Sequence, residues 1–533
     1  MLKFRPNCTF PSTTEAFVQA PNIRSTLDIL WGCVSILILC TWSILHLNVP
    51  TQVTPRSWTE RLRRKLSLIA KKLKWMILTL FVPEVVLGLA AANLYAAIVN
   101  TPIAQEKAIE DGVPWTLSHT FFANIGGISI RFPEEAGPPL SEDQRLPPAA
   151  AANNQKPARA ASVARNRLWG INYRDPEYGP GVDLKQRHSW KWNRILGRAE
   201  KLNRYGEVDW HPHEHHRQCT SRLLTKWSAL DRSERDFLDV VRFEGNIWVL
   251  DTKQLMIARD RGIIGRLPDL TEEQIADKDK GDFLVRLLAV VQVGWLFVQL
   301  IARKKYGYPC TTLEVTTAAF AVLALITYLL QWSKPKDVGT PHYIKADRVA
   351  SVEDIEAILE AEPDVIYKHT GLCNISNASL PRPIEGERST GFKSEFTSMV
   401  GIFILTNVVA SAIFGAIHLT AWNFAFPTQN ESTFWKVSSV LTIAGPLWFY
   451  ISEPLWRPEF TRWVEPYIEW PNSRFAAILY FCVRLLHYVI SPVIFLAFFF
   501  GRLYIIGEAF RGVFFLRPEV FQSTWAANLP HVG

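Results

Sequence analysis

The residues of this chain that could most readily do chemistry are four histidines in the stretch DWHPHEHHRQC, and the chemistry they suggest is metal binding. They are His211, His213, His215 and His216, with Asp209, Glu214 and Cys219 beside them. Imidazoles this close together can bind zinc or copper. However, Pro212 places the cluster in a loop, and no second ligand group stands at a fixed helical offset from it. We therefore interpret the stretch as a solvated histidine-rich turn in preference to a physiological metal site.

A second candidate site is an acidic run that precedes a long apolar stretch. Its members are Asp277, Asp279 and Asp282. At the mouth of a membrane bundle, carboxylates can hold Mg²⁺ against a diphosphate, as membrane prenyl-transfer enzymes require. Such enzymes use two facing carboxylate groups, whereas Lys278 and Lys280 neutralise much of this run, and helical geometry turns Asp277 about 200° away from Asp279. We prefer the charged start of a helix, capped by Thr271 and Gln274.

A third candidate is Glu84, which lies within an apolar stretch together with Pro83. Burying a carboxylate in a membrane costs at least about 2 to 3 kcal/mol unless the group is paired or neutral. Arg484 and His487 lie in another apolar stretch. Two alternatives stay open: a structural ion pair with Arg484 or a bond to the backbone, or a catalytic site that Glu84, Arg484 and His487 form together.

The sequence contains no motif of a common enzyme class. There is no G-x-S-x-G, no Walker loop, no H-E-x-x-H and no dinucleotide fingerprint between a strand and a helix. Paired broken helices in two repeated halves, which many transporters show, are not evident either. The sequence therefore leaves the cofactor unknown, and a catalytic function loses support but stays open.

The elements that must position these residues are membrane helices, because a bilayer core of about 30 Å needs about 20 apolar residues per helix. Seven stretches qualify, at 27–49, 75–98, 284–302, 312–332, 396–419, 436–455 and 475–500. Three of the seven cysteines, Cys33, Cys40 and Cys482, fall within them and are interpreted as small apolar residues. In the fifth stretch, Ser411 and Gly415 have the spacing that lets helices approach closely.

We therefore predict an all-α integral membrane protein, a bundle of about seven transmembrane helices with a helical extramembrane cap and a disordered Pro/Ala-rich insertion. The apolar segment from Trp115 to Ile130 is too short to span and is expected to be re-entrant or interfacial. The expected divisions are a polar tail at 1–26, two spans at 27–98, an extramembrane region at 99–283 with disorder at 133–163 and the cap at 222–282, two spans at 284–332, a loop at 333–395, three spans at 396–500, and an interfacial helix with a tail at 501–533.

The formal net charge of +8 is concentrated in one short segment between the first two predicted spans. This segment includes Arg61, Arg63, Arg64 and Lys65. A basic loop beside a membrane helix indicates a cytosolic location and a contact with anionic lipid, and gives no support for a nucleic-acid partner. With seven spans, the N-terminus then faces outward, and we expect glycosylation at Asn7, Asn374 and Asn377 but not at Asn430.

Several stretches together resemble a large family of uncharacterised multi-pass membrane proteins of filamentous fungi. They are LWGCVSILILCTWSILHLNVP, PWTLSHTFFANIGGISI, DKDKGDFLVRLLAVVQVGWLFVQLIAR, TTLEVTTAAFAVLALITYLLQWSKP and FQSTWAANLPHVG. The resemblance implies a fungal origin and a membrane helix bundle, and supplies no catalytic residues. Asp279 departs from the family pattern, which has a small polar residue at that place.

Two classes of function remain open in the plasma membrane or an endomembrane. The first is a non-catalytic receptor-like, scaffold or transport-accessory protein, with a protein partner at the cap. The alternative is an intramembrane enzyme or accessory protein of fungal lipid or terpenoid biosynthesis. A closed cavity that contains Glu84 with Asp277 or Asp282 would favour the enzyme.

Overall fold

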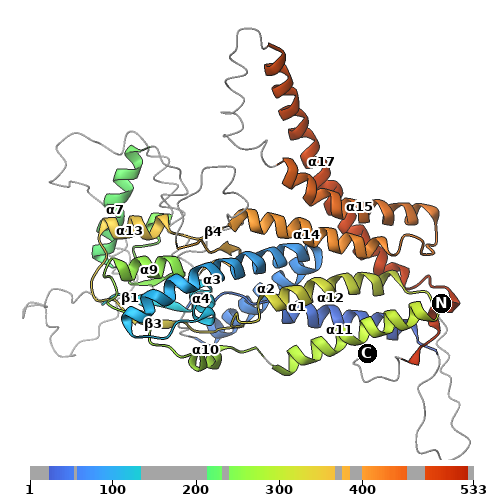
Figure 1. Cartoon of the computed structure of the whole chain (residues 1–533), viewed down its shortest axis with the longest axis horizontal. Coiled ribbons are helices and arrows are strands. Elements are labelled where there is room, and N and C mark those ends of the chain that lie inside the picture. The colour runs from blue at the N-terminus through green and yellow to red at the C-terminus, as the bar shows by residue number, and fades with distance from the viewer. Residues whose placement is uncertain are drawn as a thin grey trace, which may run out of the picture.

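The structure is a computed structural model that describes residues 23–52, 57–133, 213–230, 239–281, 283–365, 375–384, 399–452 and 474–525. This part of the chain is mostly helical and forms a helix bundle with a smaller mixed domain at one end (Figure 1). The Pro/Ala-rich insertion expected at 133–163 lies outside the described residues from residue 134 onward.

Long helices form the bundle. They are α1 (Thr26–Ser43), α3 (Pro83–Asp111), α11 (Phe283–Lys305), α12 (Thr312–Leu330), α14 (Met399–Leu419), α15 (Gln429–Ser452) and α17 (Arg474–Gly512). Capping boxes begin α1 at Ser25 and α12 at Thr311, so the first amides of these helices are satisfied where the chain enters the apolar run.

Six helices in the described part of the chain are long and apolar enough to cross a membrane, which indicates a membrane protein. They are Thr26–Ser43, Pro83–Asp111, Leu287–Lys305, Thr312–Leu330, Met399–Leu419 and Tyr488–Gly512. The predicted span at 436–455 corresponds to α15, which is not among the six because polar residues such as Lys436, Ser438 and Ser439 lower its hydropathy.

The second predicted span, 75–98, is wrong as a single helix. A break at Val82 separates α2 (Trp58–Phe81) from α3, and Pro83 takes the first position of α3, where its missing amide costs nothing. The basic segment expected to be a loop is therefore the helix α2, which a capping box at Ser57 begins. Glu84 belongs to the first turn of α3.

The predicted boundary at residue 500 is also wrong, because α17 continues without interruption to Gly512. Residues 501–512 thus extend a bundle helix, and Arg502 is buried with only 2% of its surface exposed.

The smaller domain contains a sheet, which corrects the all-α prediction. β1 (Ile128–Arg131) is the central strand, antiparallel to β2 (Ile247–Val249) and parallel to β3 (His342–Lys345). Before β1, Gly127 lies so close to the carbonyl oxygen of Phe122 that a Cβ would stand 2.6 Å from it. The segment Trp115–Ile130 is therefore not re-entrant: it forms α4 (Leu117–Asn124) and β1 within the domain core.

The cap expected at 222–282 is one part of this larger domain. The other elements are α7 (Glu214–Ala229), α9 (Thr252–Asp260), α10 (Glu272–Lys278), α13 (Val352–Glu360), β4 (Asp364–Val365) and β5 (Ser379–Leu380). Their apolar faces enclose a core that includes Phe122, Ile130, Leu223, Trp248, Leu255 and Ile355. Segments on both sides of α11 and α12 thus build a single domain.

One helix belongs to both the bundle and the domain. Near the start of α3, Leu89 and Ala92 pack against Met399 of α14, and farther along Ala108 enters the domain core. Asp111 at its end accepts hydrogen bonds from Arg259 and from the amide of Leu267. Figure 1 shows α3 running from the bundle into the domain without a break.

Both ends of the described chain meet at the opposite end of the bundle. Ile23 forms a bridge with Gln522, and the amide of Arg24 donates to the carbonyl of Phe521 at 2.8 Å, next to the short helix η4 (Pro518–Phe521). Seven crossings would have placed these ends on opposite sides, so the predicted topology does not fit the structure.

Candidate functional site: a buried ion pair in the bundle

An ion pair inside the bundle joins α3 to α17. Arg502 Nη2 donates to Glu84 Oε1 at 2.9 Å, and 3% of Glu84 is exposed. The structure thus gives Glu84 a different partner from the predicted Arg484. The side chains of Arg484 and His487 lie outside the described residues.

Aromatic side chains of α14, α15 and α17 lie around this pair. The guanidinium carbon of Arg502 lies 4.1 Å from the ring centroid of Phe414 and 5.3 Å from that of Phe498. The ring of His418 lies 4.4 Å from that of Phe414, and Trp435 donates to the carbonyl of His418 at 3.2 Å. The pair therefore sits in an apolar setting, where separating the two charges costs more than it would in water.

Several polar atoms of this pair and of the adjoining face of α14 have no hydrogen-bond partner within the described part of the chain. They are Oε2 of Glu84, Nε and Nη1 of Arg502, Nε2 of His418 and Oγ of Ser411. The other ring nitrogen of His418 is engaged, since Nδ1 lies 2.7 Å from the carbonyl of Phe414. Because that carbonyl only accepts, Nδ1 carries the proton and Nε2 is an acceptor. The site thus combines free donors and free acceptors.

Two members of the histidine cluster, His213 and His216, lie in the domain core and not in the solvated turn that we expected, whereas His215 is exposed. His213 precedes α7, while His215 and His216 belong to it, and His213 and His216 are buried. His216 donates through Nδ1 to the carbonyl of Gly245 at 3.1 Å and accepts at Nε2 from the amide of Ala350 at 3.2 Å. Burial lowers the pKa of His216 to about 3, so the ring is neutral and packs at 4.9 Å against Trp248.

No group of three or more His, Cys, Asp or Glu within the described residues is arranged to hold a metal ion. His215 instead lies 3.1 Å from the carbonyl of Ala350 and 3.5 Å from the sulfur of Cys219. His211 lies outside the described residues. In the part that the structure describes, the cluster therefore builds the contact between α7 and the sheet.

Asp277 and Asp279 of the acidic run lie in different environments. Asp279 ends α10 and accepts hydrogen bonds from the amides of Gly281 at 2.7 Å and Lys336 at 3.0 Å. Asp277 is exposed on α10, which packs against α4 of the domain, so it does not share a cavity with Glu84. Asp282 lies outside the described residues. Asp279 thus holds the junction between α10 and the segment after α12.

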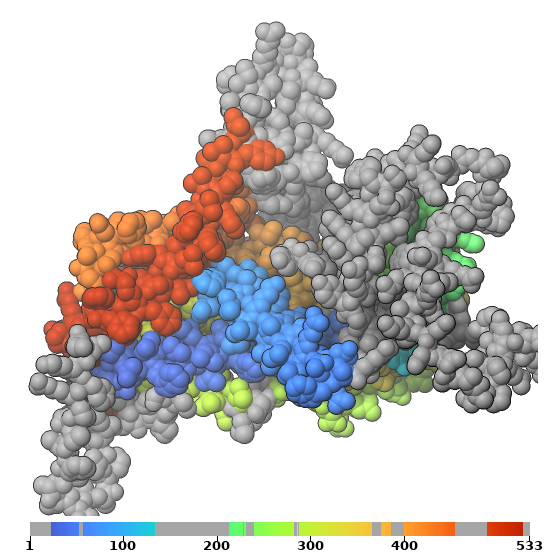
Figure 2. Space-filling view, turned by 180° about the vertical axis from the view of Figure 1, so that it is seen from behind, coloured from blue at the N-terminus to red at the C-terminus, as the bar shows by residue number. Residues whose placement is uncertain are grey.

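Helix α2 carries the basic residues Arg61, Arg63, Arg64 and Lys65 on a largely exposed surface. Farther along, Lys72 donates to Asp337 at 2.7 Å and lies 3.6 Å from the ring centroid of Trp42. These contacts fix the middle of α2 beside the domain-facing end of α1. Figure 2 shows the blue N-terminal helices uncovered along this face of the molecule.

Asn377, which we expected to be glycosylated, and Asn430, which we expected not to be, lie at different ends of the bundle. Asn377 is at the domain end, where its Oδ1 accepts from the amide of Asn48 at 2.7 Å, whereas Asn430 begins α15 at the end that holds the chain termini. Asn7 and Asn374 lie outside the described residues.

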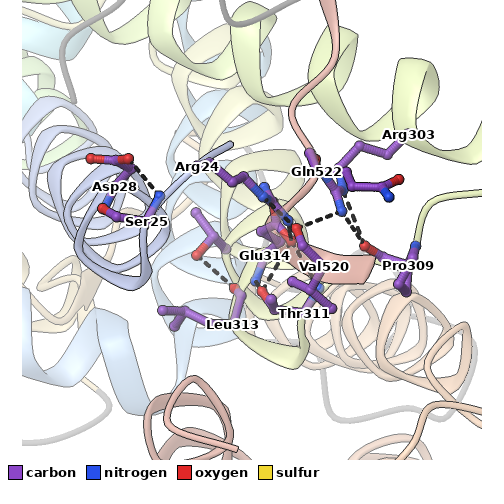
Figure 3. Close-up of polar contacts among 11 residues, drawn as sticks. Arg24, Ser25, Asp28, Arg303, Pro309, Thr311, Leu313, Glu314, Val520 and Gln522 are labelled. Atoms are coloured by element: carbon purple, nitrogen blue, oxygen red, sulfur yellow. Dashed lines mark hydrogen bonds and ion pairs between the residues drawn. The ribbon is translucent and has the colours of Figure 1, made fainter. Parts of the chain in front are cut away.

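A polar network at the terminal end involves residues that the sequence reasoning missed. Arg24 pairs with Glu314 and donates from Nε to the carbonyl of Val520 at 2.9 Å (Figure 3). Arg303 donates to the carbonyls of Pro309 at 2.6 Å and Gln522 at 2.7 Å. We call Arg24, Arg303 and Glu314 with these carbonyls the terminal clasp. The capping-box spacing of Thr311 and Glu314 could have identified these two residues from the sequence. No sequence pattern pointed to Arg24 or Arg502.

With this geometry established, comparison with known proteins gives one match. Residues 1–147 and 257–361 match the model of a family of unknown function (DUF8562). No curated protein and no solved structure matches the chain. The matched segments contain Glu84, the basic residues of α2 and the three charged residues of the terminal clasp, whereas Arg502 and the histidine cluster lie outside them.

Proposed function

We propose that this chain is a non-catalytic, receptor-like or scaffold membrane protein whose folded domain is held at an anionic membrane surface by α2. The described candidates for catalysis support this class because they do not converge on one site. His213 and His216 are buried in the domain core, Asp279 binds backbone amides, and Glu84 is paired inside the bundle.

The amphipathic character of α2 is the observation that carries the proposal. Its apolar residues recur along one face, all with at least 42% of their surface exposed: Trp58, Leu62, Leu66, Ile69, Leu73 and Ile77. We call this row the α2 apolar stripe. Basic residues occupy the remaining circumference, which is the pattern of a helix that lies in the membrane interface with its cations at the headgroups.

The contacts of Lys72 support a location of the middle of α2 at the level of the headgroups, with the helix slanting from there into the bundle. Lys72 contacts Trp42, near the end of α1, and Asp337, just beyond the end of α12. Both helices are candidate spans, so their ends mark the boundary of the bilayer core. The long side chains of Arg61, Arg63 and Lys65 can then reach lipid phosphates while their methylenes cover apolar surface.

The basic surface of α2 favours the cytosolic leaflet, which carries the anionic lipids. The folded domain lies at the same end of the bundle and is therefore placed on the cytosolic side, with the chain termini opposite. This orientation reverses the outward location expected for the domain. The fungal origin, the choice of membrane and a protein partner on the domain stay predictions from the sequence.

Lipid dependence of thermal stability tests the proposal. We expect phosphatidylserine in phosphatidylcholine nanodiscs to raise the melting temperature of the full chain, and the variant Arg61→Gln/Arg63→Gln/Lys65→Gln to lose this effect. At about 1 kcal/mol per basic residue, three losses weaken anionic-lipid binding roughly 100-fold. The matched control is Lys304→Gln/Lys305→Gln/Arg517→Gln, three exposed cations at the terminal end. An equal phosphatidylserine response in both variants would contradict the proposal.

The alternative is an intramembrane enzyme or accessory protein of fungal lipid or terpenoid biosynthesis. The free polar atoms around Glu84 and Arg502 are the observation that favours it. If chemistry occurs there, Glu84→Gln should abolish turnover of a lipid substrate supplied in the nanodisc, while the phosphatidylserine effect persists.

A further inference from the structure

The depth of the break between α2 and α3 can be measured from the domain end of the bundle. Lys72 lies at that end, beside Trp42 and Asp337. At 1.5 Å per residue, the part of α2 from Lys72 to Phe81 reaches up to about 14 Å into the bundle, since α2 slants inward as one continuous helix. In agreement, Leu80 packs beside Leu37 and Phe320, which belong to the interior of α1 and α12.

The depth of Glu84, next to this break, can also be measured from the terminal end of the bundle. Gly512 of α17 lies beside Thr312, the first residue of α12. Arg502, which binds Glu84, is about 15 Å from Gly512 along α17. The two depths together match a hydrocarbon core of about 30 Å, so Glu84 lies near its midplane.

The start of α2 and the end of α3 both lie at the domain end of the bundle. The segment before α2 is bound to the domain, since Val49 donates to the carbonyl of Ile125 at 2.9 Å and Gln52 donates to that of Gly339 at 3.1 Å. Helix α3 ends inside the domain core. Helices α2 and α3 thus enter and leave at one face, as a re-entrant hairpin with its tip at Val82 and Pro83.

The backbone at this tip is compatible with its depth. The amide of Val82 donates to Leu78 at 2.8 Å, its carbonyl accepts from Val85 at 3.1 Å, and Pro83 has no amide to satisfy. Non-helical backbone at membrane depth is tolerated where protein surrounds it, and such breaks commonly build polar sites.

We propose that the hairpin tip forms an internal hydration site, where ordered water binds Glu84, Arg502, His418 and Ser411. Arg502 offers the donors Nε and Nη1, while Glu84 Oε2 and His418 Nε2 are acceptors. A buried water makes about three hydrogen bonds and can join two such donors to an acceptor. The carboxylate and the guanidinium already compensate each other, so an added ion would leave a net charge in a low-dielectric setting. The site therefore selects a small uncharged molecule.

This site is independent of the lipid contact proposed for α2. It would exist whether or not phosphatidylserine binds, so the two proposals can fail separately.

X-ray hydroxyl-radical footprinting of the full chain in nanodiscs tests the site, because radicals formed from bound water oxidise adjacent side chains. We expect Phe414, which is 1% exposed, to be oxidised several-fold faster than Phe122, which is 0% exposed in the domain core. Equal slow oxidation of these two rings in the unsubstituted protein would overturn the proposal.

Two variants locate the water. Glu84→Leu/Arg502→Leu removes both charges together, adds no radical-reactive sulfur, and should reduce oxidation of Phe414 to the level of Phe122. Ser411→Ala/His418→Phe keeps the ion pair, serves as the second variant if the double-Leu chain does not fold, and should reduce the oxidation partly. The matched control, Glu214→Leu/Arg217→Leu on the surface of α7, should leave it unchanged. Unchanged oxidation of Phe414 in both site variants would also overturn the proposal.

Discussion

Two carboxyl groups flank β2 in the folded domain, and burial controls both. Burial raises the pKa of Asp251 to about 7 and that of Glu244 to about 7, opposed by hydrogen bonds from the amide of Gln254 and the hydroxyl of Thr220. Asp111 and Asp354 behave in the opposite way: burial alone would raise each pKa, but arginine and backbone hydrogen bonds lower it. Of these four carboxyl groups, Asp251 and Glu244 therefore have a pKa near neutral pH, and Asp111 and Asp354 do not.

For Asp251 the sign of the pH effect follows from the raised pKa. The folded state favours the protonated acid, so this contribution to stability is full below pH 3.8, the usual pKa, and is lost as the pH rises to about 7. The total change is roughly 4 kcal/mol. We expect Asp251→Asn, which keeps the helix cap, to flatten the fall in melting temperature between pH 5 and pH 7.5.

The measurement is a series of thermal melts of the full chain in one detergent. Asp269→Asn, at an exposed position, serves as the control and should retain the slope of the unsubstituted protein. Parallel slopes for Asp251→Asn and the unsubstituted protein would contradict the assignment.

At the scale of elements, close approach between helices organises the C-terminal part of the bundle. A Cβ at Gly415 of α14 would stand 3.0 Å from the carbonyl oxygen of Ser439 in α15, and it would also meet Ile443. The small-residue spacing of Ser411 and Gly415 therefore correctly predicted a tight helix contact. Helix α17 makes a similar approach, where Gly501 lies beside Ser438.

Gly415→Ala should push α14 and α15 apart and destabilise the bundle by about 1 to 3 kcal/mol, the usual cost of overpacking. Gly294→Ala in α11 is the control, because no atom lies within 4 Å of its added Cβ and alanine favours helix. Unfolding in sodium dodecyl sulfate, followed by circular dichroism, compares the two. Equal stability of both variants would show that the contact is loose.

The elements that the sequence predicted well are the uninterrupted apolar helices. Helix α12 occupies Thr312–Leu330 where 312–332 was expected, because apolar length alone identifies such a helix. The break at Val82 escaped notice because both sides of it are apolar. The sheet was not predicted because β1 pairs with strands far away in sequence. Strands this short also show too few residues for an alternating apolar pattern to be recognised. The partner of Glu84 was missed for the same reason, since pairing between distant helices is not encoded locally.

At the scale of the whole molecule, the two ends of the bundle carry different chemistry. The terminal end holds the terminal clasp, and the other end holds the folded domain and α2. Asn430 and Asn377 therefore lie on opposite sides of any membrane that the bundle crosses.

Glycosylation should accordingly never occur at Asn430 and Asn377 in the same molecule. With the domain on the cytosolic side, we expect modification at Asn430 and none at Asn377, the reverse of the expectation from seven spans. Gel mobility before and after glycosidase treatment of Asn430→Gln and Asn377→Gln chains provides the measurement. Modification of Asn377 alone would reverse the proposed orientation, and modification of both would rule out a crossing by α14, which lies between them in the chain.

The terminal clasp also bears on how the chain is made. A ribosome releases Arg24 long before Glu314, and the carbonyl of Val520 that Arg24 binds lies 496 residues later. The guanidinium of Arg24 is therefore incompletely bound until the ribosome has synthesised Val520. A chain truncated before residue 518 could not close this contact, so α1 of such a chain would keep an incompletely bound cation at its start.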